Sequence, residues 1–95
     1  MTITMTPQAA QKVKAMMHDN DLEDHVVRIA VASASTEGIT YELDIVDEVN
    51  DNDRAFESDG VKVVVDPRSY LHLKGTRVDW TGSGFAFNNP NAAAS

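Results

Sequence analysis

The chain has 95 residues, a hydrophobic content of 42%, a formal net charge of −7 and no cysteine. This length predicts one domain over residues 1–95, with a thin hydrophobic core. The acidic balance argues against nucleic-acid binding, which needs a basic surface. The absence of cysteine excludes disulfides, thiolate metal ligands and thiol nucleophiles supplied by these residues.

The sequence gives no sign of a membrane span or a secretory leader. No apolar run approaches the ~20 residues that a spanning helix needs. The first ten residues, MTITMTPQAA, lack the basic and apolar regions of a signal peptide. We therefore expect a cytoplasmic protein without a membrane partner.

The N-terminal quarter predicts a short edge strand and then a helix. Residues 1–5 alternate weakly between polar and apolar side chains. Thr6-Pro7 is a typical helix start, because Thr can cap the helix and Pro fits its first turn. The helix is expected to end near residues 18–20, with an apolar stripe made of Ala9, Val13, Met16 and Met17.

Two strands are predicted next, separated by a small polar loop at Ser33–Glu37. His25–Ala32 alternates between two faces, and Ile39–Val46 does so more regularly. In the second strand the apolar residues Ile39, Tyr41, Leu43 and Ile45 point inward, and Thr40, Glu42 and Asp44 point outward. A strand with one wet face favours antiparallel pairing.

Eight acidic residues fall between positions 42 and 59: Glu42, Asp44, Asp47, Glu48, Asp51, Asp53, Glu57 and Asp59. A solvated acidic face is the simplest interpretation, and a basic partner or a weakly bound cation remains an alternative. A calcium loop that starts at Asp51 fails, because Phe56 occupies the position that requires Gly.

In the segment 54–76, most of the informative residues are typical of turns and helix ends. A short strand, Arg54–Ser58, leads into Asp59-Gly60, a pair typical of a type I′ hairpin turn. The next strand, Val61–Asp66, ends at Pro67, where Asp66 can cap a short helix that Gly75 closes.

After this helix, Arg77–Trp80 predicts another strand, and residues 82–84 a turn. Phe85 and Phe87 share one face, and we expect a flexible tail at 90–95. The fold class is α+β, with an N-terminal helix packed on mainly antiparallel or mixed β-sheets and one short inserted helix. The predicted inward residues are Val27, Ile29, Val31, Tyr41, Leu43, Ile45, Phe56, Val63, Val65, Leu71, Val78, Trp80, Phe85 and Phe87.

The search for catalytic and metal-binding motifs returns nothing with a defined spacing. There is no P-loop, HExxH or GxSxG, and Gly82-Ser83-Gly84 is not followed by a helix as a nucleotide fingerprint would be. The three histidines, His18, His25 and His72, have no ligand spacing. We therefore predict neither an enzyme, nor a metal site, nor a bound cofactor.

The order of motifs along the chain resembles the A-type iron–sulfur carrier family, the HesB/IscA-like domain. The resemblance rests on ITMTPQAAQKVKAMM, on RIAV leading to GITYELDIVDE, on FESDGVKVVVDPRSYLHLKGTRVDW and on the close GSGFAFNNPN. It runs nearly from end to end. The resemblance implies three cysteines that hold iron or a cluster, one in a glycine-rich loop and two in a Cys-Gly-Cys segment just after NPN.

This sequence departs from that pattern at each cysteine. By ungapped placement Thr36 stands where the loop cysteine would be, beside Glu37, and Ser95 lies about where the cysteine pair would begin. A Thr hydroxyl keeps its proton at neutral pH and does not replace a thiolate. The link from Trp80 to Gly82 is also shorter than in typical members. Thr36 is therefore a degenerate ligand position, and a single carboxylate at Glu37 is a weak iron ligand.

We therefore expect a cysteine-less member of the family that acts as a protein-interaction module. The expected partners are iron–sulfur assembly proteins, apo-targets or a second copy of the chain. Two alternatives remain: metal binding through carboxylate or imidazole ligands, and cluster carriage with ligands that a partner supplies.

Overall fold

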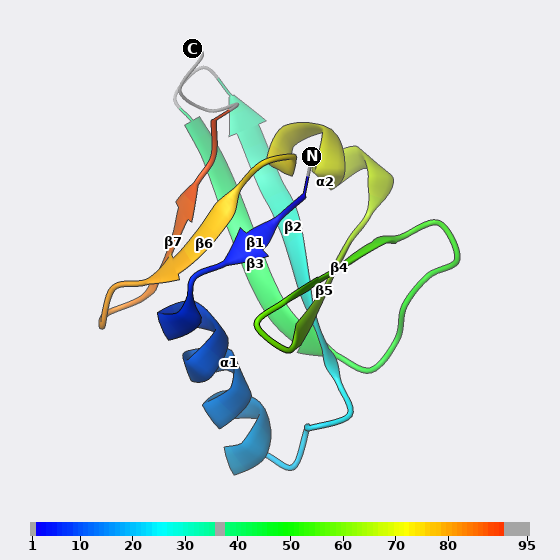
Figure 1. The fold of residues 1–95 in the computed structure, drawn as a ribbon. Coiled ribbons are helices and arrows are strands. Elements are labelled where there is room, and N and C mark those ends of the chain that lie inside the picture. The colour runs from blue at the N-terminus through cyan, green and yellow to red at the C-terminus, as the bar shows by residue number, and fades with distance from the viewer. Residues whose placement is uncertain (1, 36–37, 91–95) are drawn as a thin grey trace.

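The computed structural model describes residues 2–35 and 38–90, which form two mixed β-sheets and two helices (Figure 1). The α+β prediction is confirmed. Apart from Pro90, the predicted flexible tail lies outside the described residues. In chain order the elements are β1 (Thr4–Met5), α1 (Pro7–Asp19), β2 (Val26–Ser35), β3 (Gly38–Val46), β4 (Arg54–Ser58), β5 (Val61–Val65), α2 (Pro67–Leu73), β6 (Arg77–Trp80) and β7 (Phe85–Asn88).

The larger sheet has the strand order β3-β2-β5-β4, and the smaller one has the order β1-β6-β7. The β2–β3 and β4–β5 pairs are antiparallel, and β2 and β5 are parallel. In the smaller sheet β1 and β6 are parallel, and β6 and β7 are antiparallel. Strand β1, near the N-terminus, therefore pairs with β6 in the last third of the chain.

Both helices begin where their capping residues predict. The Ala9 amide donates to Thr6 Oγ1 at 3.2 Å, and the Ser69 amide donates to Asp66 Oδ2 at 3.1 Å. In each case Pro occupies the first turn, where its missing N–H costs no hydrogen bond. The two predicted helix starts are thus confirmed to the residue.

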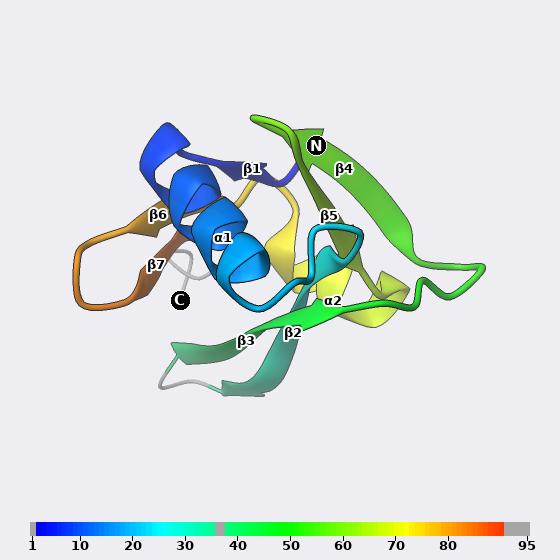
Figure 2. The same cartoon turned by 90° about the horizontal axis from the view of Figure 1, so that it is seen from below.

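The core lies between the two sheets and is closed at one end by α1, which lies beside β1 and β6 on one side and β5 on the other (Figure 2). Most of the fully buried side chains come from β2, β5 and the inner face of α1, and they include Ala9, Val13, Val27, Ile29, Val63 and Val65. Ile3 before β1, Leu73 of α2 and Val78 of β6 complete the core. Val64 is also fully buried although it points to the opposite face of β5, so this strand is covered on both faces.

Two sequence predictions are wrong. Ser33–Ser35 continues β2 and pairs in register with residues 38–40, after an irregularity between Val31 and Ser33. Cross-strand hydrogen bonding outweighs the small polar composition of this stretch. Leu71, predicted to lie in the core, is 65% exposed, whereas Leu73 is fully buried. Residues four apart share a helix face, and α2 turns Ser69 and Leu73 inward.

Among the described residues, the longest helix is α1, with 13 residues. No helix in this part of the chain has the length and apolar character to cross a membrane.

Candidate functional site

The end of β2, the start of β3 and the end of β7 lie at the same end of the molecule (Figure 1). Tyr41 of β3 stacks on Phe87 of β7, with ring centroids 4.5 Å apart and ring planes at 17°. The hairpin ends where Ser35 pairs with Gly38, and β7 ends at Asn88. Two segments that lie far apart in the sequence therefore meet at this end of the molecule.

Asn89 fixes this meeting point. Its side-chain amide donates to Tyr41 Oη at 3.0 Å and to the His72 carbonyl at 2.7 Å. Asn89 is 8% exposed, so both hydrogen bonds form in a largely water-free environment. One side chain thus joins β3, α2 and the segment after β7. The sequence signal for it was the NPN motif, which sequence reasoning did not connect with Tyr41.

The predicted positions Thr36 and Glu37 lie outside the described residues, and their side-chain geometry is therefore not assigned. Their neighbours form a shallow depression of about 310 Å³ that is lined by Ser33, Ser35, Gly38, Ile39 and Thr40. Backbone and hydroxyl groups dominate this lining. Such groups are hydrogen-bonding partners, and they are poor ligands for soft iron–sulfur chemistry.

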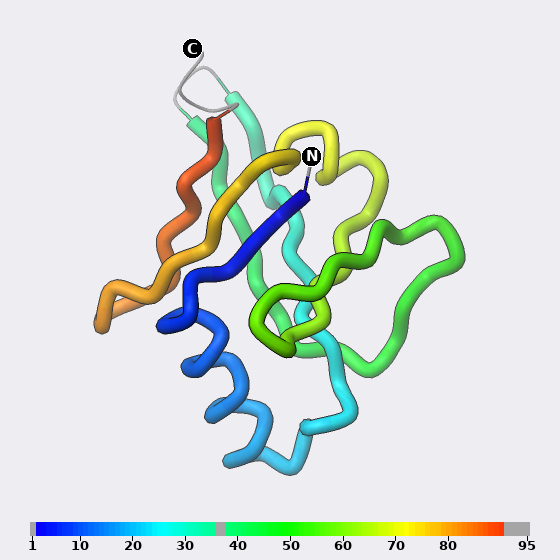
Figure 3. Tube along the Cα trace, in the orientation of Figure 1, coloured from blue at the N-terminus to red at the C-terminus, as the bar shows by residue number. Residues whose placement is uncertain are grey.

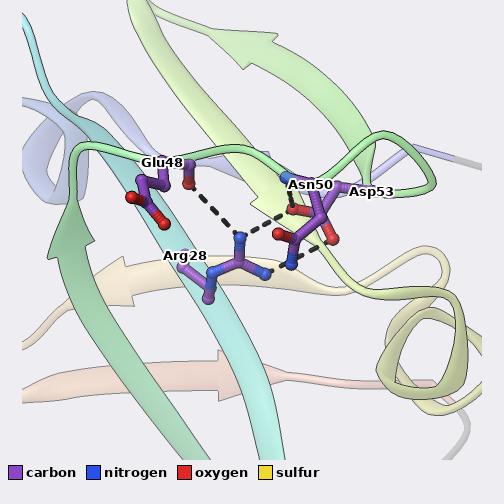
Figure 4. Close-up of polar contacts among 4 residues, drawn as sticks. All are labelled: Arg28, Glu48, Asn50 and Asp53. Atoms are coloured by element: carbon purple, nitrogen blue, oxygen red, sulfur yellow. Dashed lines mark hydrogen bonds and ion pairs between the residues drawn. The ribbon is translucent and has the colours of Figure 1, made fainter.

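A second feature, which sequence reasoning missed, is an ion pair between Arg28 of β2 and Asp53 in the segment between β3 and β4 (Figure 4). Arg28 Nη2 donates to Asp53 Oδ2 at 2.6 Å and to the Glu48 carbonyl at 3.4 Å. The Asn50 amide donates to the same Asp53 oxygen at 2.9 Å. The acidic segment is thereby fastened to the sheet.

The hydrogen bond between the two side chains sets the electrostatics of the pair, against the effect of burial. The Asp53 side chain is 0% exposed and that of Arg28 is 22% exposed. The hydrogen bond from Arg28 holds the pKa of Asp53 below its usual value, although burial acts in the opposite direction. The same hydrogen bond raises the pKa of Arg28. Because Asp53 stays ionised and tied to Arg28, it is a structural carboxylate and no free cation ligand.

The histidines are dispersed. His18 Nδ1 lies 2.8 Å from Glu23 Oε1, and His25 Nδ1 lies 2.8 Å from Asp24 Oδ1. Within residues 2–35 and 38–90, no three His, Cys, Asp or Glu side chains come close enough together to hold a metal ion. Both histidine–carboxylate contacts are local: His18 lies in the last turn of α1, and Glu23, Asp24 and His25 lie between α1 and β2.

Comparison with known proteins identifies the family to which this chain belongs. The model of the family described as iron–sulphur cluster biosynthesis matches residues 1–95. The chain belongs to this family. Two curated relatives, each described as iron-binding protein IscA, come from Serratia proteamaculans and Xenorhabdus nematophila. Each is 40% identical over 98 aligned positions, which cover 99% of this chain and 91% of the relative.

Two solved structures share the fold. The crystal structure of Escherichia coli SufA, described as involved in biosynthesis of iron–sulfur clusters, has a TM-score of 0.76 and 32% identity, and the match covers 95% of this chain and 87% of that one. The crystal structure of IscA with a [2Fe-2S] cluster has a TM-score of 0.79 and 27% identity, over 94% and 86% of the two chains.

The ligand set of this chain does not fit a cysteine-held cluster. None of its 95 residues is cysteine, and clusters are held by cysteine thiolates, with histidine in some centres. These 95 residues therefore share the fold of the family and carry Thr at position 36, where the resemblance implies a cysteine.

Proposed function

We propose that this chain takes part in iron–sulfur cluster biosynthesis by binding other proteins, and that it does not itself ligate a cluster. One observation carries the proposal: the whole chain matches the family, yet it contains no cysteine. The partners are cluster-assembly proteins, apo-targets or a second copy of the chain. No catalytic step belongs to this function.

The contacts at the end of the molecule where β3 begins and β7 ends support recognition of a partner through the shape of the surface. Tyr41 and Phe87, which are partly buried, and the buried Asn89 hold β3 to β7 and to the segment that follows it. These contacts fix the shape of this end of the molecule. A chain without a thiolate can still present a surface of fixed shape to a partner, because recognition depends on complementary shape and charge.

The test is anaerobic reconstitution of the purified protein with iron and sulfide, followed by metal and sulfide counting and an absorption spectrum. The Serratia IscA relative, prepared in parallel, is the positive control. We expect this chain to retain neither iron nor sulfide and to show no visible absorption. Iron with sulfide would contradict the proposal. Iron without sulfide would favour carboxylate or imidazole ligands, and Glu37→Gln would then be the discriminating variant.

Partner binding is tested separately, by affinity capture from the organism's own extract with quantitative mass spectrometry. The expected result is enrichment of cluster-assembly proteins or apo-targets over a bait of equal size and charge. Reconstituted partner pairs then have to bind with purified components. Capture of neither class, together with a monomeric state in solution, would sink the protein-binding function.

A further inference from the structure

We propose that the free edge of β3 binds an extended segment of a partner protein in which basic and apolar residues alternate. The segment adds a strand to the larger sheet. This inference rests on the proposed protein-binding function and names the surface and the chemistry of the partner.

The first observation is the position of β3 in the sheet. It is a terminal strand in the order β3-β2-β5-β4, and its nine residues pair with β2 along its whole length. Across the described part of the chain, no strand pairs with its other edge. The outward N–H and C=O groups of such an edge are a ready template for another extended chain.

The second observation is that β3 has two chemically different faces. Its inner row, Tyr41, Leu43 and Ile45, is only half-buried, whereas Glu42 and Asp44 on the outer face are exposed. An added strand continues both faces of a sheet, because successive side chains alternate. Apolar residues of the segment would therefore complete the burial of the inner row, and basic ones would lie beside Glu42 and Asp44.

The third observation is that the acidic row is not neutralised from within. The sheet register places Arg28 directly opposite Asp44. However, the Arg28 guanidinium donates a hydrogen bond of 2.6 Å to Asp53 (Figure 4). In residues 2–35 and 38–90, Glu42 and Asp44 have no ion pair. The charge on this edge is available to a cationic partner.

Charge also selects between occupants. Antiparallel pairing of β3 with β3 of a second copy would bring the Glu42 and Asp44 rows together, and like charges across a strand pair are destabilising. The other terminal strand, β4, is a weaker candidate. It has five residues, and its last residue Ser58 is tied to Met5 by hydrogen bonds of 2.9 and 3.2 Å. The long acidic edge of β3 therefore favours a basic segment.

The experiment titrates the full chain with a nine-residue peptide of alternating valine and lysine, and follows the backbone amide signals by NMR. Two control peptides carry glutamate in place of lysine, or N-methyl groups on alternate backbone nitrogens. The test variant is Glu42→Lys/Asp44→Lys. The matched control, Asp19→Lys/Glu23→Lys, makes the same change in net charge at two exposed positions away from the sheet edge.

We expect the lysine peptide to shift signals of residues 38–46 saturably, and both control peptides to bind much more weakly. Reversal of both β3 charges is expected to raise the Kd about tenfold or more, since two attractive cross-strand pairs become repulsive. The matched control should stay within about twofold, because exposed charges at a distance are screened by salt.

Three results would overturn the proposal: no saturable shift, undiminished binding of the N-methylated peptide, or equal weakening in both charge variants. Circular dichroism establishes that each variant is folded. The outcome is separable from the broader function. If cluster-assembly partners bind the wild type and Glu42→Lys/Asp44→Lys equally well, the edge assignment is wrong and the protein-binding function stands.

Discussion

Asp53 lies within the most acidic stretch of the chain, yet its carboxylate has a different role from its neighbours. Asp51 is exposed to solvent, whereas the side chain of Asp53 is fully excluded from it and is bonded to Arg28 and to the Asn50 amide. A buried carboxylate contributes to stability only while these donors satisfy it. The pair therefore anchors the wide excursion between β3 and β4 that Figure 3 traces.

Replacing Asp53 by Asn should destabilise the protein by about 2 kcal/mol at neutral pH, because Arg28 loses a charged hydrogen-bond partner. The pKa of Asp53 is lowered in the folded state, so its contribution is fully present above the unfolded pKa of about 3.9. It disappears as the pH falls through the lower folded pKa. Urea denaturation at pH 7, 5 and 3 measures this difference.

The matched control for this prediction is Asp51→Asn, which changes the same charge on an exposed neighbour. We expect it to alter the free energy of unfolding by no more than about 0.5 kcal/mol. A gap between wild type and Asp53→Asn that stays constant down to pH 3 would contradict the ionic origin of the effect.

At the scale of elements, α2 shows what determines which face of a short helix is buried. Seven residues contain barely two turns, so the sequence offers both Leu71 and Leu73 as core candidates. The Asp66 cap sets where the helix begins, and Ser69 then accepts a hydrogen bond from the Val31 amide at 3.1 Å. With Ser69 turned to the sheet, Leu73 follows on the same face and Leu71 faces solvent.

Leu73→Ala should lower the free energy of unfolding by about 2–4 kcal/mol, because it leaves a cavity in the core. Leu71→Ala, a chemically identical change two residues away, should cost less than about 0.5 kcal/mol. Thermal and urea unfolding of the two variants compares them directly. Equal losses would place Leu71 in the core after all.

The elements that sequence analysis located correctly carry local signals. Thr6-Pro7 and Asp66-Pro67 satisfy helix N-termini with their own side chains, and Asp59-Gly60 adopts positive φ angles of 50° and 80°. The misses depend on distant partners instead. Ser33 belongs to β2 because it pairs with Thr40 of β3. Arg28 forms its ion pair with Asp53, which is 25 positions away in the sequence. Short-range patterns do not contain this information.

Only the local sequence motifs of the candidate site were predictable, because its contacts join residues that lie far apart in the sequence. The motif order pointed to the family, which the family match confirms. The NPN motif was recognised as a sequence signature, but its first partner, Tyr41, is 48 positions from Asn89. The positions Thr36 and Glu37 stay predictions, since they lie outside the described ranges.

At the scale of the whole molecule, no strand pairing joins the two sheets within residues 2–35 and 38–90. They are joined by side chains, of which the Tyr41–Phe87 stack and the Asn89 hydrogen bonds lie at one end. The smaller sheet is therefore held to the larger one by packing and by a few polar contacts. Loss of those contacts should loosen β7 before it affects the central strands.

Asn89→Ala should destabilise the protein by about 1–2 kcal/mol, since Tyr41 Oη and the His72 carbonyl each lose a donor. Hydrogen exchange should accelerate at residues 85–88 more than at residues 27–29 or 63–65. Tyr41→Phe removes one of the two acceptors and should have a smaller effect. Uniform acceleration throughout the chain would argue against a local role for Asn89.

The parallel pair of β1 and β6 has a consequence for how the protein is made. Thr4 pairs with Arg77, and the Thr6 hydroxyl donates to Asp79, a partner 73 positions later. While a ribosome is still adding the middle of the chain, the first strand has no place to dock, and the buried Ile3 stays exposed to solvent. Closing so long a loop is slow compared with local folding. Strand β1 is therefore synthesised before β6 and is among the last of these elements to reach its final place.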